Sequence, residues 1–249
     1  MLTPEGGRHM YGYLRLETEQ TGRRPVLQYR MLCGLSVLQA SVPMPDNLTP
    51  RQQERRINRA AEKLWESGVN RILLPKNFSW KACLHKTGLA EVEVESLCRA
   101  AAAQLAIEVL LLRGWEPERA TVALAGKRID RAIVRTAELL AQQVSGLRIE
   151  VPEGGMELAD WLQEEYGLPV LRSDGLRPAF TVSFDEYWKG RGPVLQLWGS
   201  HPDLLGAEVW VPGLEIPEEC EPMPLLAALL ESGMLSEQML RARGVGNHP

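Results

Sequence analysis

Residues 121–171 read TVALAGKRIDRAIVRTAELLAQQVSGLRIEVPEGGMELADWLQEEYGLPVL, and this stretch decides the fold class. Short runs typical of buried strands, at 121–125, 147–151 and 168–171, alternate with helical patterns at 128–144 and 156–166. Strands separated by helices of this length are typical of parallel βαβ units with right-handed crossovers. We therefore predict an α/β protein in which 121–125 and 147–151 are adjacent parallel strands.

The remaining sequence extends this pattern in both directions. Strand patterns at 180–184, 194–198 and 208–211 follow, and helical patterns at 225–230 and 236–243 come last. Near the beginning, β patterns at 11–17, 26–29 and 33–40 predict an antiparallel start before an amphipathic helix at 51–63. A strand at 69–74 and a loop containing Phe78 and Trp80 come next.

A long helical pattern at 93–113 separates the two halves. It is apolar almost all round, which predicts a central packing element or a subunit interface. The motif Gly114-Trp115-Glu116-Pro117 follows it and is the best sequence candidate for a boundary. We therefore expect a β-rich α/β N-terminal lobe at 1–116 and a mostly parallel C-terminal lobe with terminal helices at 117–249.

Composition excludes several classes of protein. The 249 residues carry 28 Lys+Arg and 32 Asp+Glu, a net charge of −4, and are 45% hydrophobic and 24% charged. These values exclude disorder, collagen and coiled coil, and the acidic balance argues against nucleic-acid binding. The stripe Arg51, Arg55 and Arg59 fits the solvated face of an amphipathic helix better than a nucleic-acid surface.

The cysteines predict a reducing compartment and no metal site. Cys33, Cys83, Cys98 and Cys220 form no CxxC pair and no disulfide framework. Cys83, His85 and Cys98 lack a fourth ligand at zinc spacing. Because no stretch is long and apolar enough to span a bilayer, we expect a cytoplasmic protein without membrane contact.

At the level of element order, residues 118–213 resemble a Rossmann-like half followed by extra strands. The dinucleotide-binding fingerprint requires Gly-x-Gly-x-x-Gly at the first strand-to-helix turn. The corresponding turn here reads Ala125-Gly126-Lys127-Arg128-Ile129, with one glycine. The resemblance therefore predicts a Rossmann-like, mostly parallel sheet without the glycine-rich cofactor loop.

Ligands of open parallel sheets bind beyond the carboxyl ends of the strands, so the residues after each strand are the candidate site. Gly126 would allow a tight turn, and Lys127 and Arg128 at a helix N-terminus would attract an anionic group. Glu150 would accept a hydrogen bond from a ligand hydroxyl. The ligand-binding candidates are Gly126, Lys127, Arg128, Glu150, Asp185 and His201.

Two classes of function remain open. The sequence contains no Gly-x-Ser-x-Gly elbow, His-Glu-x-x-His pair or P-loop, so we assign no catalytic residue. The first hypothesis is a non-catalytic or regulatory protein that needs no cofactor. The alternative is an enzyme or sensor that binds a nucleotide-like or phosphorylated small molecule, such as NAD or another nucleotide, at the strand ends.

The sequence also predicts a homodimer or another small homo-oligomer. The helical pattern at 93–113, Trp198, Trp210 and the apolar segment 225–230 offer surface that a partner or the chain's own core must cover.

Overall fold

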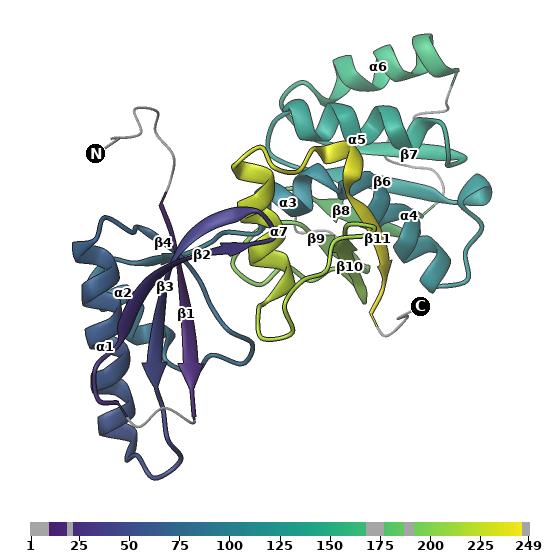
Figure 1. The fold of residues 1–249 in the computed structure, drawn as a ribbon. Coiled ribbons are helices and arrows are strands. Elements are labelled where there is room, and N and C mark those ends of the chain that lie inside the picture. Colours follow the sequence, from purple (N-terminus) through teal and green to yellow (C-terminus); the bar gives the residue numbers. More distant parts are fainter. Residues whose placement is uncertain (1–9, 19–21, 168–176, 187–191, 246–249) are drawn as a thin grey trace. The chain divides into compact units, whose positions relative to one another are not determined.

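The chain divides into two compact units. The computed structural model describes residues 10–18, 22–167, 177–186 and 192–245 (Figure 1). Unit 1 comprises Met1–Glu93 and Gly213–Ser236, and unit 2 comprises Val94–Pro212 and Glu237–Pro249. The first boundary between the units therefore lies between Glu93 and Val94, at the start of the apolar helical pattern at 93–113. The sequence predicted the boundary after that pattern, near residue 116.

Unit 1 contains a five-stranded mixed sheet. Its order is β2-β3-β1-β4-β5, with bounds β1 Tyr11–Glu17, β2 Val26–Leu32, β3 Leu35–Pro43, β4 Arg71–Leu73 and β5 Ala90–Glu91. Strands β2 and β3 form the expected antiparallel hairpin, but β3 then pairs with β1 in parallel, so the antiparallel start was wrong for that pair. Burial explains the order, since β3 is buried along nearly its whole length and takes an inner position, while β2 is largely exposed.

Helices α1, Pro50–Glu66, and α2, Lys81–Thr87, form the core of unit 1 with the sheet. Helix α2 lies in the stretch after Trp80 that the sequence pattern assigned to a loop. The best-covered side chains of this core include Leu14, Ile57, Ala60, Ala61, Leu64, Val69, Ile72 and Leu84. Helix α7, Pro222–Glu231, belongs to the same unit and buries Leu225–Leu229, so most of the apolar segment 225–230 is covered by the chain's own core.

A hydrogen-bonded set of polar side chains ties α7 to the sheet of unit 1. The Tyr11 hydroxyl donates to Glu231 Oε2 at 2.9 Å, and Arg71 forms an ion pair with the same carboxylate. Burial, followed by the Glu231 carboxylate, raises the pKa of Tyr11 to about 12. The folded unit therefore favours the protonated phenol.

This shift predicts a loss of stability in alkali. The folded pKa of Tyr11 lies above its ordinary value of 10.0, so its contribution is complete below pH 10 and disappears as the pH rises towards 12. We expect the difference in unfolding free energy between wild type and Tyr11→Phe to shrink across this window. Urea titrations of both proteins at several pH values measure it, and a constant difference would contradict the assignment.

Unit 2 contains the predicted parallel sheet. Its order is β7-β6-β8-β9, with bounds β6 Thr121–Ala125, β7 Gly146–Glu150, β8 Phe180–Ser183 and β9 Val194–Gln196. Every pairing in it is parallel, and β6 lies directly beside β7, with Thr121 opposite Gly146. The predicted Rossmann-like α/β class is thus confirmed. The strand predicted at 168–171 lies outside the described residues.

Helices α5, Arg131–Ala141, and α6, Gly155–Tyr166, follow β6 and β7 and contact one another. The helical pattern at 93–113 forms two helices, α3 Glu95–Ala100 and α4 Ala102–Leu112, interrupted at Ala101. Helix α4 packs against α5 and against strands β10, Ala207–Trp210, and β11, Arg241–Gly244, which explains why it belongs to unit 2. Its role as a central packing element is confirmed.

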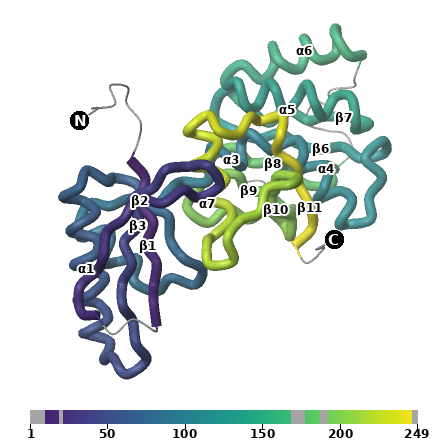
Figure 2. Tube along the Cα trace, viewed as in Figure 1, coloured from purple at the N-terminus to yellow at the C-terminus, as the bar shows by residue number. Residues whose placement is uncertain are grey.

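The last described segment is a strand where the sequence predicted a helix at 236–243. A single 3-10 turn, Glu237–Met239, precedes β11, Arg241–Gly244, which pairs antiparallel with β10, Ala207–Trp210 (Figure 2). Arg243 lies opposite Glu208, donates to its Oε1 at 2.8 Å and stacks over the Trp210 ring at 5.1 Å. These cross-strand contacts override the local helical pattern.

None of the described helices is long and apolar enough to cross a bilayer.

Candidate functional site

The strand order of unit 2 creates a topological switch point at β6. Its neighbour on one side is β7, and its neighbour on the other is β8. Loops that leave such a point on opposite sides open the crevice in which sheets of this class bind ligands. The segments after β6 and β8 meet there, because the Lys127 backbone N–H donates to Asp185 Oδ2 at 2.7 Å. Two of the predicted site residues are therefore direct neighbours.

Gly126 provides space for packing. It is buried, and its φ lies outside the left-handed region, so the turn does not require glycine for its backbone angles. A Cβ added there would lie 3.0 Å from Ile133 Cδ1 and 3.5 Å from Asp185 Oδ2. The expected tight-turn role is thus corrected, since the glycine lets α5 and the β8 loop approach the end of β6.

The loop after β6 stays extended instead of entering the helix. Ile129 N donates to Glu153 O at 2.9 Å, and Arg128 forms a parallel bridge with Glu153. Helix α5 consequently begins at Arg131, not at 128. Lys127 and Arg128 are exposed on this extended segment, so the expectation that they lie at the helix N-terminus was wrong.

The N-terminus of α5 is capped from within the chain. Asp130 is the N-cap residue, and its Oδ1 accepts the Ile133 N–H at 3.0 Å. Its other oxygen, Oδ2, pairs with Arg99 of α3. A carboxylate therefore binds one of the donors that an anionic ligand of this helix would use.

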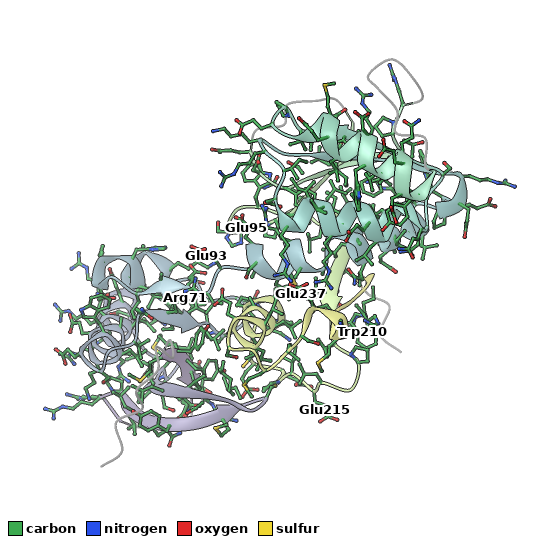
Figure 3. All side chains as sticks on the ribbon, turned by 90° about the horizontal axis from the view of Figure 1, so that it is seen from above. Arg71, Glu93, Glu95, Trp210, Glu215 and Glu237 are labelled. Atoms are coloured by element: carbon green, nitrogen blue, oxygen red, sulfur yellow. The ribbon has the colours of Figure 1, made fainter. Side chains whose placement is uncertain are left out.

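Arg99 links three segments of unit 2. Its Nη1 donates to Phe184 O at 2.6 Å, just after β8, and its guanidinium lies 5.5 Å from the centre of the Phe184 ring. Glu95, labelled in Figure 3, lies 3.5 Å from the same nitrogen, one helical turn away on α3. Arg99 thus neutralises Asp130 and fixes the β8 loop.

The backbone of Glu150 lies next to the site, whereas its side chain has a partner elsewhere on the sheet. Gly126 N donates to Glu150 O at 3.4 Å, in register with the β6–β7 ladder. The Glu150 side chain forms an ion pair with Arg148, with Nε and Oε1 2.8 Å apart. Its carboxylate is therefore engaged on the sheet itself.

His201 belongs to a different part of the sheet edge. It is exposed in the loop after β9, which is separated from β6 by β8. That loop folds back on its own strand, since Gln196 N donates to Asp203 O at 2.8 Å. The strand order therefore places His201 two strands from Gly126 and Lys127.

Sequence reasoning missed Arg99, Asp130 and Ser183. The Ser183 hydroxyl donates to Asp185 O at 2.7 Å and accepts from Trp198 Nε1 at 3.2 Å, so it orders the loop that carries Asp185. The N-cap role of Asp130 could have been predicted, because an Asp directly before an amphipathic helical pattern is a preferred N-cap residue. Arg99 had no such signal, since its partners at the site, Asp130 and Phe184, are distant in sequence.

The predicted absence of a zinc site stays a prediction. Two of the cysteines considered for it, Cys83 and Cys98, are buried in helices. Among the described residues, no three His, Cys, Asp or Glu side chains are grouped to hold a metal ion. Cys83 is buried in α2 of unit 1, and Cys98 is buried in α3 of unit 2. Burial raises the pKa of Cys83, and it raises that of Cys98 to about 12. Both behave as small apolar core residues.

No protein-family model and no curated protein matches the sequence. Among solved structures, the chain is similar to the crystal structure of L-tryptophan dehydrogenase from Nostoc punctiforme, with 11% identity and a TM-score of 0.30. The match covers 71% of this chain and 56% of the dehydrogenase, so the chain spans little more than half of that protein's length.

Proposed function

We propose that the chain is a non-catalytic or regulatory protein built on a Rossmann-like scaffold whose phosphate-binding position is filled by its own carboxylates. The observation that carries this proposal is the pair of internal acceptors at the switch point. Asp185 Oδ2 accepts the Lys127 N–H at 2.7 Å, and Asp130 Oδ1 accepts the Ile133 N–H at 3.0 Å. A pyrophosphate would need these backbone donors.

Electrostatics supports the same proposal. A phosphate near the start of α5 would approach the Asp185 carboxylate, and like charges about 4 Å apart repel by about 1 kcal/mol even at the dielectric constant of water. Arg99 offers little compensation, because it already pairs with Asp130 and Glu95. The turn also lacks two of the three glycines of the dinucleotide-binding fingerprint. This disfavours phosphate binding, because side chains at those positions keep the backbone away from a ligand.

The alternative function has one observation in its favour. The side chains of Lys127 and Arg128 are exposed beside the switch point, where they could bind a phosphorylated or nucleotide-like small molecule without displacing Asp130. An enzyme or sensor that uses NAD or another nucleotide would then need both cations. This alternative makes the opposite prediction in the same experiment.

The experiment is a thermal-shift screen with NAD, NADP, AMP and inorganic phosphate. We expect no concentration-dependent rise in Tm. A ligand at one hundred times its Kd adds about 2.7 kcal/mol, which corresponds to a rise of about 5–10 °C for a chain of this size. A saturable rise that Lys127→Ala and Arg128→Ala both abolish would overturn the proposal and favour the alternative. Glu157→Gln, on the exposed first turn of α6, is the matched surface control.

The proposal includes a cytoplasmic location. All four cysteines are free, and Cys83, Cys98 and Cys220 are buried, as expected for a protein that folds in a reducing compartment.

A further inference from the structure

Strand β2 forms an open edge of the sheet in unit 1. The sheet order places it at the end, with β3 as its neighbour, and none of the other described strands pairs along its outer side. Its seven residues, Val26–Leu32, make it longer than the typical strand. A long edge with unpaired backbone groups is a template for pairing with another chain.

The hairpin turn fixes which backbone groups face outwards. Cys33 and Gly34 have φ values of 48° and 88°, the left-handed angles of a two-residue hairpin turn, and Leu32 lies opposite Leu35. The residues that flank such a turn form a hydrogen-bonded pair, and hydrogen-bonded pairs alternate along the ladder. Leu27, Tyr29 and Met31 therefore direct their N–H and C=O groups away from β3.

The three residues with outward backbone groups have apolar side chains, and two of these side chains are exposed. Tyr29 is 73% exposed and Met31 is 61% exposed, while Leu27 packs against the core formed with α1 and α2. Natural edges are usually protected by lysine, proline or inward charges. The charged residue of β2 is Arg30, which donates to Gln39 Oε1 at 3.2 Å. The exposed side chains of Tyr29 and Met31 therefore carry no charge that would repel a second strand.

We propose that β2 pairs antiparallel with β2 of a second copy of this chain, with the two-fold axis at Tyr29. This inference is independent of the proposed function. Tyr29 then lies opposite the partner's Tyr29, and Leu27 lies opposite the partner's Met31. All three residues with outward backbone groups form hydrogen-bonded pairs, and the two sheets become one continuous sheet.

Charge and backbone chemistry select this register. On the other face of the pair, Gln28 lies opposite the partner's Arg30, so no two like charges oppose each other. An axis at Arg30 would oppose two guanidinium groups. An axis at Gln28 would place Pro25, which has no N–H, opposite the partner's Met31 and lose a ladder bond. The edge is thus self-complementary around Tyr29, as an isologous interface requires.

Light scattering and sedimentation of the full chain test the assembly over a dilution of about a hundred-fold. We expect a dimer for wild type, and for Tyr29→Lys a dimer Kd at least about tenfold higher, because two ammonium groups then meet at the axis. Leu111→Lys, on a 55% exposed position of α4, is the matched control and should remain dimeric. A monomeric wild type, or an unchanged Kd for Tyr29→Lys, would overturn the proposal.

Crosslinking tests the register. Residues in a hydrogen-bonded antiparallel pair have Cα atoms about 5.5 Å apart, within the range that a disulfide spans. With oxidised glutathione, Tyr29→Cys should form a reducible dimer. Gln28→Cys should not, because diagonal positions lie about 7–8 Å apart. Wild type, treated in parallel, reports any background from the native thiols. Crosslinking of Gln28→Cys but not of Tyr29→Cys would overturn the register.

Discussion

Arg99→Ala is expected to lower the free energy of unfolding of unit 2 by about 3 kcal/mol, the loss typical of a part-buried charge with several hydrogen bonds. The substitution removes the hydrogen bond to Phe184 O, the ion pairs with Asp130 and Glu95, and the stacking on the Phe184 ring. It also leaves the N-cap carboxylate of α5 without its cation. The start of α5 and the loop after β8 should therefore loosen together.

Urea denaturation measures this loss, with Arg119→Ala as the matched control. Arg119 pairs with Glu116 at 2.9 Å, but their side chains are 82% and 64% exposed. Such surface pairs contribute at most about 1 kcal/mol. Arg99→Lys should recover part of the stability, because lysine keeps the positive charge but lacks the several N–H donors of the planar guanidinium. Equal losses for Arg99→Ala and Arg119→Ala would contradict the linking role of Arg99.

Gly12→Ala is expected to cost unit 1 about 2 kcal/mol through overpacking. Glycine in a strand interior is normally destabilising, so alanine would ordinarily be the better residue. Here the new Cβ would lie 2.8 Å from Val69 Cγ1 and 3.5 Å from Leu64 Cδ1. Both neighbours are fully buried, and the branched side chain of Val69 has little rotamer freedom with which to retreat.

Gly22→Ala is the matched control for this change. A Cβ at Gly22 would meet Pro43 Cγ at 3.5 Å, an ordinary contact, and Gly22 is exposed. We expect its unfolding free energy to stay within about 0.5 kcal/mol of wild type. The two variants are compared by urea denaturation. A stability gain in Gly12→Ala would show that the packing of β1 against Leu64 and Val69 is looser than the contacts indicate.

The parallel sheet of unit 2 was predictable because its signals are local. The strands at 121–125 and 147–151 are short apolar runs, and an amphipathic helix between them forces a parallel crossover. The same reasoning failed at 236–243, where cross-strand contacts of Arg243 with Glu208 and Trp210 decide the structure. Pairing over such a sequence distance leaves no periodic signal.

The boundary between the units was harder to predict for a similar reason. Helix α7 returns to unit 1 through the contacts of Glu231 with Tyr11 and Arg71, more than a hundred residues earlier in the chain. A linear sequence with a glycine–proline break near 116 suggests a single boundary. Tertiary contacts instead divide the chain into discontinuous parts.

Three of the six candidate residues lie together in the structure, while their binding of a ligand stays a prediction. Gly126, Lys127 and Asp185 do meet at the switch point, because residues after adjacent parallel strands share one edge of the sheet. Sequence reasoning took Asp185 as a ligand contact, whereas its Oδ2 accepts a backbone N–H of its own chain. Arg99, which neutralises Asp130 there, comes from a helix that gave no hint of the site.

The most direct test of the central claim is an NMR titration of the backbone amides of Lys127 and Ile133 with NAD and with inorganic phosphate. These two N–H groups already donate to Asp185 and Asp130. We therefore predict that neither amide resonance moves with ligand concentration. Saturable shifts at Lys127 and Ile133, with either ligand, would show that an anion displaces the carboxylates and would contradict the proposed non-catalytic scaffold.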